Sequence, residues 1–247
     1  MKPTVWIRAG VVVIYGTNLD ADVHQHHSLQ LIWSKTDSTC KLNGSSLHGP
    51  AIVGSCVEHQ LEMAEGWVVL VEPNSVLGEA LSQLLDTQSI KTFELASYNQ
   101  HAPRQNSDFS NYLTILFEHL AVPMTGLYNH NRLTRDLRIN QLIAQLDLCL
   151  TVDCIKPSGW KASEVAAQLA LSESRFLHLF SEEMGIAWRP YLLWRRMNCA
   201  IQAMVQGQSA TQAAHLAGFS DSAHLSRTFR NNFGMSLRQA KTLFKAQ

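Results

Sequence analysis

Residues 209–238 of this 247-residue chain read SATQAAHLAGFSDSAHLSRTFRNNFGMSLR. The small apolar residues at the start of the stretch recur at helical spacing. Gly218 ends this short helix, because glycine adopts the left-handed backbone without a steric penalty. Ser220 or Asp221 then caps a second helix. A short helix, a glycine turn and a second helix with a polar outer face predict a helix-turn-helix.

Residues 163–183 are a fainter copy of the same pattern. Ala166 aligns with Ala214 at an offset of 48 positions, and Phe180 aligns with Phe229 at an offset of 49. Two copies at nearly constant spacing indicate an internal repeat. The sequence therefore predicts two helix-turn-helix units, at about 163–183 and 209–233, joined by a long helix over 188–206.

The second unit carries the motif Ala-x3-Gly-Phe-Ser-Asp-x3-Leu-Ser-Arg-x-Phe-Arg-x2-Phe-Gly-Met-Ser over residues 214–236. This motif resembles the signature of the AraC/XylS family of bacterial transcription regulators, and the resemblance covers about 110 C-terminal residues. It implies a regulator that binds double-stranded DNA and meets RNA polymerase. His178 departs from the family pattern, which has arginine there, and predicts a weaker DNA contact by the first unit.

The buried and exposed faces of the two recognition helices follow from helical spacing. Leu225 and Phe229 are related as i and i+4 and face inward, which leaves Arg227 outward. A guanidinium bonds guanine O6 and N7 together, so Arg227 is the best candidate for reading a base. A rigid joining helix predicts recognition helices about 34 Å apart, one DNA turn. The predicted DNA contacts are Ser174, Arg175, His178, Arg195, Arg196, Ser222, Ser226, Arg227 and Arg230, with Arg195 and Arg196 assigned to the DNA backbone.

The charge of the chain is unevenly distributed although the net charge is zero. From residue 134 onward the chain has 13 Lys and Arg and 8 Asp and Glu, a net charge of +5. The preceding part has 7 Lys and Arg and 12 Asp and Glu, a net charge of −5. Such asymmetry favours a nucleic-acid-binding half joined to a different half. The five cysteines form no CxxC pair, and the apolar run near the start is too short for a signal or membrane segment. A soluble, cytoplasmic protein is expected.

The N-terminal half carries many short β-branched runs separated by glycine turns, which predict a small barrel or sandwich. One strand is expected over 23–33, and Asn43-Gly44 indicates a hairpin. The pattern His24-x-His26-x3-Gln30, followed by His59, resembles the cupin barrel of small-molecule-sensing AraC-type regulators.

Three interpretations of these four side chains remain open. Imidazole nitrogens are ligands for a divalent metal ion. The same residues also suit a pocket for an organic effector without metal, or a purely structural role. No cofactor is certain. A cupin oxygenase or isomerase fused to a DNA-binding domain is the rival class, but no nucleophilic triad or phosphate loop is present, so we expect no enzyme.

Helical periodicity begins after Pro73. One helix is expected over 75–85, and another begins near Asp108 or Ser110 and runs to residue 120. This helical pair resembles the dimerisation element of the AraC/XylS family, which implies a homodimer contact through the apolar stripe of the second helix; the alternative is that these helices cover the barrel. In a third interpretation, the N-terminal half senses nothing and only dimerises or binds a protein partner. The stripe consists of Leu113, Leu116, Phe117 and Leu120.

The sequence thus predicts an α+β multidomain protein. Residues 1–127 form a cupin-like small β-barrel with helices, which serves sensing and dimerisation. Residues 128–133 are a linker, and residues 134–247 are an all-α domain of two helix-turn-helix units joined by a long helix. The first helix of that domain is expected over 134–150, with Leu137, Leu142, Ile143, Leu146 and Leu150 facing inward.

Overall fold

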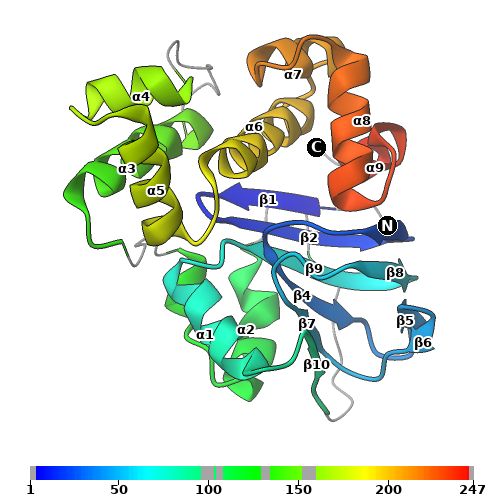
Figure 1. The fold of residues 1–247 in the computed structure, drawn as a ribbon. Helices are drawn as coiled ribbons and strands as arrows, with labels where there is room; N and C mark the ends of the chain where they lie inside the picture. The colour runs from blue at the N-terminus through cyan, green and yellow to red at the C-terminus, as the bar shows by residue number, and fades with distance from the viewer. Residues whose placement is uncertain (1–3, 96–102, 104–107, 129–133, 152–159, 245–247) are drawn as a thin grey trace. The chain divides into compact units, whose positions relative to one another are not determined.

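A computed structural model describes residues 4–95, 103, 108–128, 134–151 and 160–244 (Figure 1). Two compact units are present: Met1–His130 together with Ser226–Gln247, and Asn131–Leu225. The first boundary falls at the predicted linker, of which residues 129–133 lie outside the described residues. The second boundary falls inside a helix of the predicted DNA-binding domain.

The first unit contains a six-stranded antiparallel sheet in the order β1-β2-β9-β4-β7-β10. Its central strands are rich in valine, isoleucine and leucine, as expected where both faces of a strand are covered. The sequence analysis missed its short edge strand β10. The strands are β1 (Thr4–Arg8), β2 (Val11–Thr17), β4 (Leu29–Ser34), β7 (Ala51–Val53), β9 (Glu65–Val71) and β10 (Ile90–Thr92).

A second sheet of four strands has the order β3-β8-β5-β6. Asn43 and Gly44 join β5 to β6 with φ values of 52° and 77°, the left-handed pair that a tight hairpin needs. The predicted strand over 23–33 is wrong in one respect, because residues 25–28 interrupt it and separate β3 from β4. The strands of this sheet are β3 (Ala21–His24), β5 (Cys40–Leu42), β6 (Ser45–Ser46) and β8 (His59–Met63).

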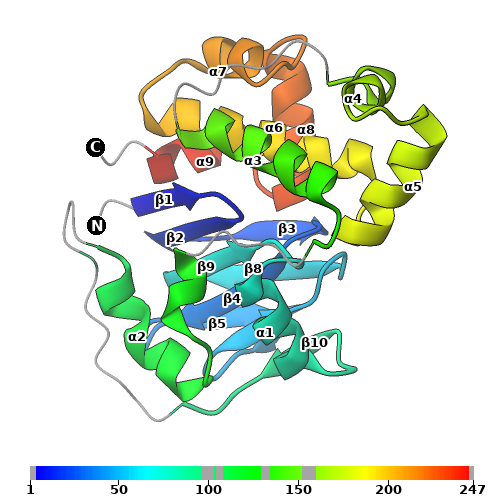
Figure 2. The same ribbon diagram turned by 90° about the vertical axis from the view of Figure 1, so that its left-hand side faces the viewer.

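Helices α1 (Val76–Leu85) and α2 (Ser110–His119) pack on one face of the larger sheet (Figures 1 and 2). The Ser75 hydroxyl accepts a hydrogen bond from Gly78 N at 3.0 Å and caps α1. Gly78 is required there, because a Cβ atom would lie 2.1 Å from the carbonyl oxygen of Glu72. A short 3-10 helix, η1 (Met124–Leu127), follows α2.

The apolar stripe of α2 belongs to this core and not to a surface. Leu113, Leu116 and Phe117 are fully buried, and Leu120 is only 4% exposed. They pack within the same cluster as the inward residues of β2, β4 and β9. The prediction that this stripe forms a dimer contact is therefore corrected, since these side chains have no surface to offer a partner. The alternative interpretation, in which the helices cover the sheet, agrees with the packing.

The second unit is helical, and helix α8 continues from it into the first unit. A short helix followed by a turn and a longer helix occurs twice, as α4 with α5 and as α7 with α8. The long helix α6 lies between the two pairs in the chain. The helices are α3 (Leu137–Thr151), α4 (Ala162–Gln168), α5 (Glu173–Met184), α6 (Trp188–Val205), α7 (Ala210–Leu216), α8 (Ser222–Phe233) and α9 (Leu237–Phe244).

Aromatic rings form the centre of the second unit. Phe180 lies 5.0 Å from Trp188 and 5.3 Å from Tyr191 between ring centroids, and Phe176 lies 5.3 Å from Trp188. Edge-to-face pairs at this distance add to the free energy gained by burial alone. This cluster joins α5 to the start of α6.

Helix α3 contributes three of its five predicted inward residues to this core, namely Leu142, Ile143 and Leu146. The side chain of Leu150 lies outside the described residues. Leu137 was predicted to face inward, but it is the first residue of the helix and is 75% exposed. That prediction is wrong, because the helix begins three residues later than expected; within its first turn it is Ile139, fully buried, that faces the core.

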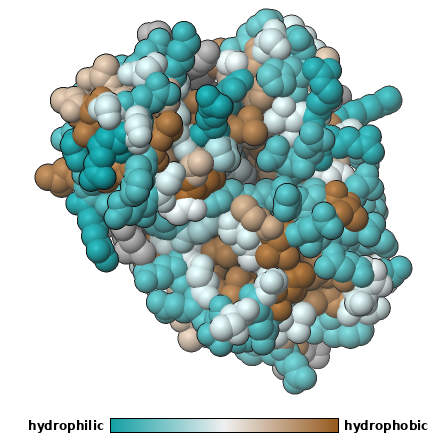
Figure 3. Space-filling model, in the orientation of Figure 1, coloured by the Kyte–Doolittle hydropathy of each residue, from teal (hydrophilic) through white to brown (hydrophobic). Residues whose placement is uncertain are grey.

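The described part of the chain contains no helix that is both long enough and apolar enough to cross a lipid bilayer. In Figure 3, hydrophilic colouring predominates, with apolar atoms visible between the polar ones. The large apolar side chains that the structure exposes are Val23, Tyr128, Leu137 and Leu148.

Candidate nucleic-acid interface and histidine cluster

The turn between α7 and α8 is built by local hydrogen bonds. Ser209 and Gln212 form a reciprocal capping box at the start of α7. Gly218 follows the helix with φ of 75°, in the left-handed region that glycine favours. At the start of α8, Asp221 Oδ1 accepts a hydrogen bond from His224 N at 2.7 Å. Of the two predicted caps, Asp221 is thus the residue that caps α8.

Arg196 on α6 holds the same turn together. Its Nε donates to Ala217 O at 2.9 Å and its Nη2 donates to Gly218 O at 2.6 Å. The guanidinium carbon also lies 4.3 Å from the centroid of the Phe219 ring. Burial lowers the pKa of this half-buried side chain. Arg196 was predicted to contact the DNA backbone, but its donors already serve the turn, and sequence reasoning missed this role.

Arg195 is also removed from the predicted DNA contacts. Its side chain is 2% exposed, and Nη2 lies 2.7 Å from Asp147 Oδ1 on α3. A guanidinium enclosed in this way cannot reach a phosphate group. Loss of either partner would leave an uncompensated buried charge, which costs about 3–5 kcal/mol of folding free energy. Arg195 therefore joins α6 to α3.

Helix α8 has the two faces that its sequence predicts. Leu225 is fully buried and Phe229 is 3% exposed. Arg227 is exposed on the opposite side, and Ser222 and Ser226 are half-buried. The outer face of α8 thus carries the Arg227 guanidinium and, partly exposed, the hydroxyl groups of Ser222 and Ser226, which can donate to base edges and phosphates.

Arg230 lies further along α8 and forms an ion pair within the first unit. Its Nη2 is 3.2 Å from Asp22 Oδ2, and both side chains are more than half exposed. The backbone of Asp22 also donates to Gly234 O at 2.8 Å. An exposed pair of this kind contributes at most about 1 kcal/mol, so Arg230 can exchange this partner for another anion at low cost.

The turn between α4 and α5 repeats the first turn with different residues. The Ser172 hydroxyl caps α5 by accepting from Arg175 N at 3.2 Å. Ala170 has φ of 53° and occupies the position that corresponds to Gly218 at the offset of 48. An alanine in the left-handed region is uncommon and carries a steric cost.

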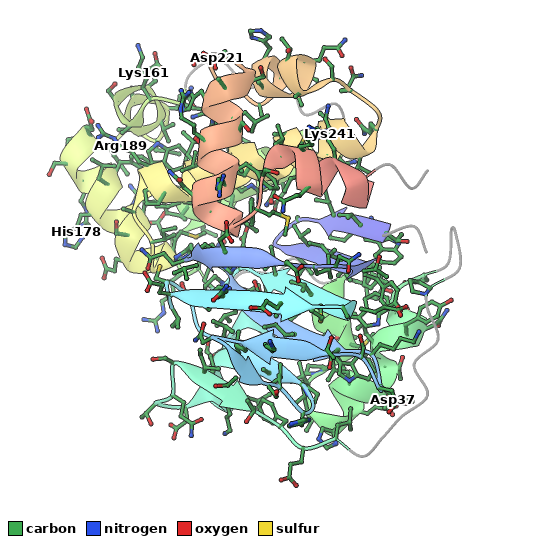
Figure 4. All side chains as sticks on the ribbon, turned by 90° about the vertical axis from the view of Figure 1, so that its right-hand side faces the viewer. Asp37, Lys161, His178, Arg189, Asp221 and Lys241 are labelled. Carbon is green, nitrogen blue, oxygen red and sulfur yellow. The ribbon has the colours of Figure 1, made fainter. Side chains whose placement is uncertain are left out.

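The predicted contact residues of α5 are exposed. Ser174, Arg175 and His178 all face solvent, whereas Phe176 and Phe180 are fully buried. His178 Nδ1 lies 3.7 Å from Glu182 Oε2, one helical turn away. Figure 4 shows the His178 side chain pointing away from the helix, and Arg189, which the sequence analysis did not single out, is also exposed at the start of α6.

The four predicted pocket residues of the first unit come together. His24 ends β3, His26 lies in the following loop, Gln30 is on β4 and His59 begins β8. Ring centroids of His24 and His59 are 4.3 Å apart, and those of His26 and His59 are 5.2 Å apart. All four side chains are buried. The prediction that these residues share one site therefore agrees with their geometry, which places them between two sheets and a loop.

The three imidazoles are poor bases in this position. Burial lowers the pKa of His24 to about 4, and the neighbouring His59 adds to the effect. Burial likewise lowers the pKa of His26 to about 4, although its contact with Gln30 opposes the shift. The pKa of His59 is also lowered by burial. The cluster is therefore neutral at pH 7, and each ring keeps one nitrogen lone pair free of a proton.

A family model and several known proteins match part of the helical segment. A family model described as a helix-turn-helix domain matches residues 165–242. The probable transcriptional regulator LumQ of Photobacterium leiognathi is 36% identical over 75 residues, which cover 30% of this chain and 30% of LumQ. The virulence regulon transcriptional activator VirF of Yersinia enterocolitica is 32% identical over 84 residues, which cover 34% of this chain and 31% of VirF. The chain thus matches about a third of the length of these relatives.

A solved structure extends the likeness to the fold of the whole chain. The crystal structure of an apo ToxT variant from Vibrio cholerae has a TM-score of 0.51 and 13% identity, and the match covers 98% of this chain and 96% of that chain. At this identity the similarity concerns the fold alone, a β-rich N-terminal region followed by a helical C-terminal region. The family model and the relatives together identify residues 165–242 as a helix-turn-helix domain, similar to a segment of known transcription regulators.

Proposed function

We propose that the protein is a sequence-specific DNA-binding transcription regulator that reads two adjacent major-groove segments with α5 and α8. One observation carries the proposal: α8 exposes Arg227 opposite the buried Leu225 and Phe229, within a matched helix-turn-helix domain. A helix of this kind enters the major groove, and its outward side chains meet base edges. Double-stranded DNA is therefore the partner.

The two recognition helices have different parts in this mechanism. On α8, Arg227 bonds a guanine at O6 and N7 while Ser222 and Ser226 donate to bases or phosphates. On α5, Arg175 is the strongest donor and Ser174 supports it. His178 contributes hydrogen bonding without a full charge, because an imidazole is largely neutral at pH 7. We therefore expect α8 to supply more of the specificity than α5.

The β-rich region supplies the regulatory input in this proposal. We interpret its two antiparallel sheets as a cupin-like scaffold, with the pocket at His24, His26, Gln30 and His59 as its binding site for an effector. Transcription regulators of this kind act on the bacterial chromosome, in the cytoplasm, and meet RNA polymerase there. A homodimer remains part of the proposal, but its contact must use surfaces other than the buried stripe of α2.

The test is the variant Arg227→Ala in a DNA-binding assay. A recognition site is first selected from random duplexes with the wild-type protein. We expect a loss of about 1–3 kcal/mol in affinity, or roughly 5- to 150-fold, together with relaxed preference at the contacted base pair. Lys41→Ala on β5 is the matched control, since it removes one exposed positive charge outside the helix-turn-helix domain of residues 165–242.

Two outcomes would contradict the assignment of Arg227. One is an affinity loss below about 1 kcal/mol, which is too small for a bidentate base contact. The other is an equal loss on every DNA sequence, which indicates a phosphate contact. If the wild-type protein enriches no sequence at all, the proposed function itself is wrong.

A further inference from the structure

The three buried histidines of the first unit are oriented by the backbone around them. His24 Nδ1 lies 2.8 Å from Asp22 O, His26 Nδ1 lies 2.9 Å from Ser28 O, and His59 Nδ1 lies 2.9 Å from Val57 O. A carbonyl oxygen only accepts hydrogen bonds, so each Nδ1 carries the proton. Each Nε2 therefore has a free lone pair. Histidines that bind metal ions show this arrangement, in which a carbonyl fixes the tautomer and the ring.

Two of the Nε2 atoms, those of His59 and His26, have no hydrogen-bond donor of the described residues placed against them. His59 is 1% exposed, and its Nε2 has no hydrogen-bond partner in the described part of the chain. Near His26, the neighbour of Nε2 is the Gln30 side-chain oxygen, at 3.0 Å. With Nδ1 protonated, both of these atoms are acceptors and do not bond to each other as placed, although the Gln30 amide can turn over and present its NH2 group instead. A cation close to both atoms also satisfies them, and it can satisfy His59 Nε2 at the same time.

The spacing of the ligand atoms suits one ion. The three histidines offer nitrogen atoms that all lie within 4.8 Å of one another. Ligand nitrogens at 2.0–2.1 Å from a tetrahedral ion are about 3.4 Å apart, so side-chain adjustments of about an ångström close the site. Neutral imidazoles need no deprotonation before they bind a metal ion.

The chemistry of the ligands selects the class of ion. Three imidazole nitrogens suit zinc, copper, nickel, cobalt or iron, whereas magnesium and calcium prefer several oxygen ligands. We propose that His24, His26 and His59 bind one divalent transition-metal ion through their Nε2 atoms, with the Gln30 amide oxygen beside the fourth position. We further infer that this ion is the effector of the regulator, an inference that rests on the proposed function.

Cobalt binding tests the site directly. The full chain, purified without a histidine tag and treated with chelator, is titrated with Co2+ while visible absorption and bound metal are measured. We expect about one ion per chain, with the intense bands of a four-coordinate site. His59→Gln is expected to weaken binding at least 100-fold. The control is His48→Ala, which removes an exposed imidazole from the same unit and should bind like the wild type.

A folding measurement distinguishes the loss of a metal ligand from the loss of the fold. Far-UV circular dichroism establishes whether His59→Gln is folded, and His24→Gln is the second variant if it is not. Zn2+ should raise the melting temperature of the wild type, because an ion that binds only the folded chain stabilises it. Less than about 0.1 ion per folded wild-type chain overturns the site. Equal binding by wild type and a folded variant overturns the assigned ligands.

The inference that the metal ion is the effector is tested separately, by measuring DNA affinity. DNA affinity of the wild type should change at least 5-fold between metal-free and Zn2+-loaded protein, a typical coupling between two sites, and His59→Gln should abolish the change. Stoichiometric metal with unchanged DNA affinity overturns the effector role and leaves the site structural. Metal binding without any DNA binding instead rejects the proposed function, so the failures are distinguishable.

Discussion

Ala170 is the residue at which the two helix-turn-helix pairs differ most clearly. It holds φ of 53° where the second pair has Gly218 at 75°. A side chain in this region costs about 1–2 kcal/mol, and the freedom of glycine in the unfolded chain offsets about half of that cost. Ala170→Gly should therefore raise the free energy of unfolding by about 0.5–1 kcal/mol, measured by urea denaturation.

Gly218→Ala is the matched reverse change and should lower stability by about 1 kcal/mol. If Ala170→Gly instead lowered the urea midpoint, the left-handed conformation at this position would be wrong. The turn of the first pair was recognised from the sequence by its alignment. Its strain was not, because alanine in a turn gives no local signal of positive φ.

The environment of Glu65 predicts how the stability of the folded protein changes with pH. Burial alone raises the pKa of its carboxyl group, but hydrogen bonds from Lys35 at 2.8 Å and from the Tyr15 hydroxyl at 2.5 Å outweigh it. The net pKa lies below its usual value of 4.5. A lowered folded-state pKa means that this stabilisation is present above pH 4.5 and is lost as pH falls through the folded pKa.

Glu65→Gln should therefore reduce stability at pH 7 and flatten its decline below about pH 4.5, as followed by thermal denaturation from about pH 3 to pH 7. Glu62→Gln, on the adjoining strand β8 and about half exposed, is the control and should leave the decline unchanged. A wild-type decline that persists unaltered in Glu65→Gln would show that other carboxylates cause it.

At the scale of elements, helix α2 allows a test of whether an apolar stripe packs in the core of its own chain or contacts a second chain. Leu113 is fully buried against the larger sheet. Leu113→Ala should cost about 2–5 kcal/mol, because it leaves a cavity in a packed core. Chemical denaturation measures this loss, and sedimentation should show the same oligomeric state as the wild type. Val23→Ala, at a side chain 60% exposed, should change stability by less than about 0.5 kcal/mol.

A stable Leu113→Ala protein that no longer self-associates would restore the dimer prediction for α2. The packing argues against this result. Periodicity identified the apolar stripe correctly, but a stripe has the same pattern whether it meets its own sheet or a second chain. Only the tertiary contacts distinguish the two.

Other elements show the same division between local and distant causes. The caps of α1, α5 and α7 at Ser75, Ser172 and Ser209 are local and could be predicted from sequence. The burial of Arg195 could not, since it depends on Asp147, which lies 48 positions away in the chain. The part played by Arg196 depends similarly on the carbonyl groups of a distant turn. From the sequence, Arg195 and Arg196 were therefore predicted to contact DNA, whereas in the fold both side chains make structural contacts within the protein.

At the scale of the whole molecule, the charge asymmetry and the repeated helical pattern are features of the sequence itself, and both indicate DNA binding. The histidine set was also found from sequence. Alternate spacing places His24 and His26 on one side of an extended segment, and the resemblance to the cupin pattern added Gln30 and His59. What sequence could not supply was the backbone partner of each ring. Those carbonyl contacts fix which nitrogen is free, and so they decide what the site can bind.

The last prediction concerns how the two helix pairs act together. If α5 and α8 read separate segments of one duplex, Arg175→Ala and Arg227→Ala should each relax preference at a different group of base pairs, roughly 10 base pairs apart. Selection from random duplexes followed by sequencing measures these preferences. Because contacts with separate segments of the duplex share no partner, the affinity losses of the double variant should then add within about 0.5 kcal/mol. Changes at the same base pairs, or a double variant no weaker than Arg227→Ala, would mean that α8 reads the DNA alone.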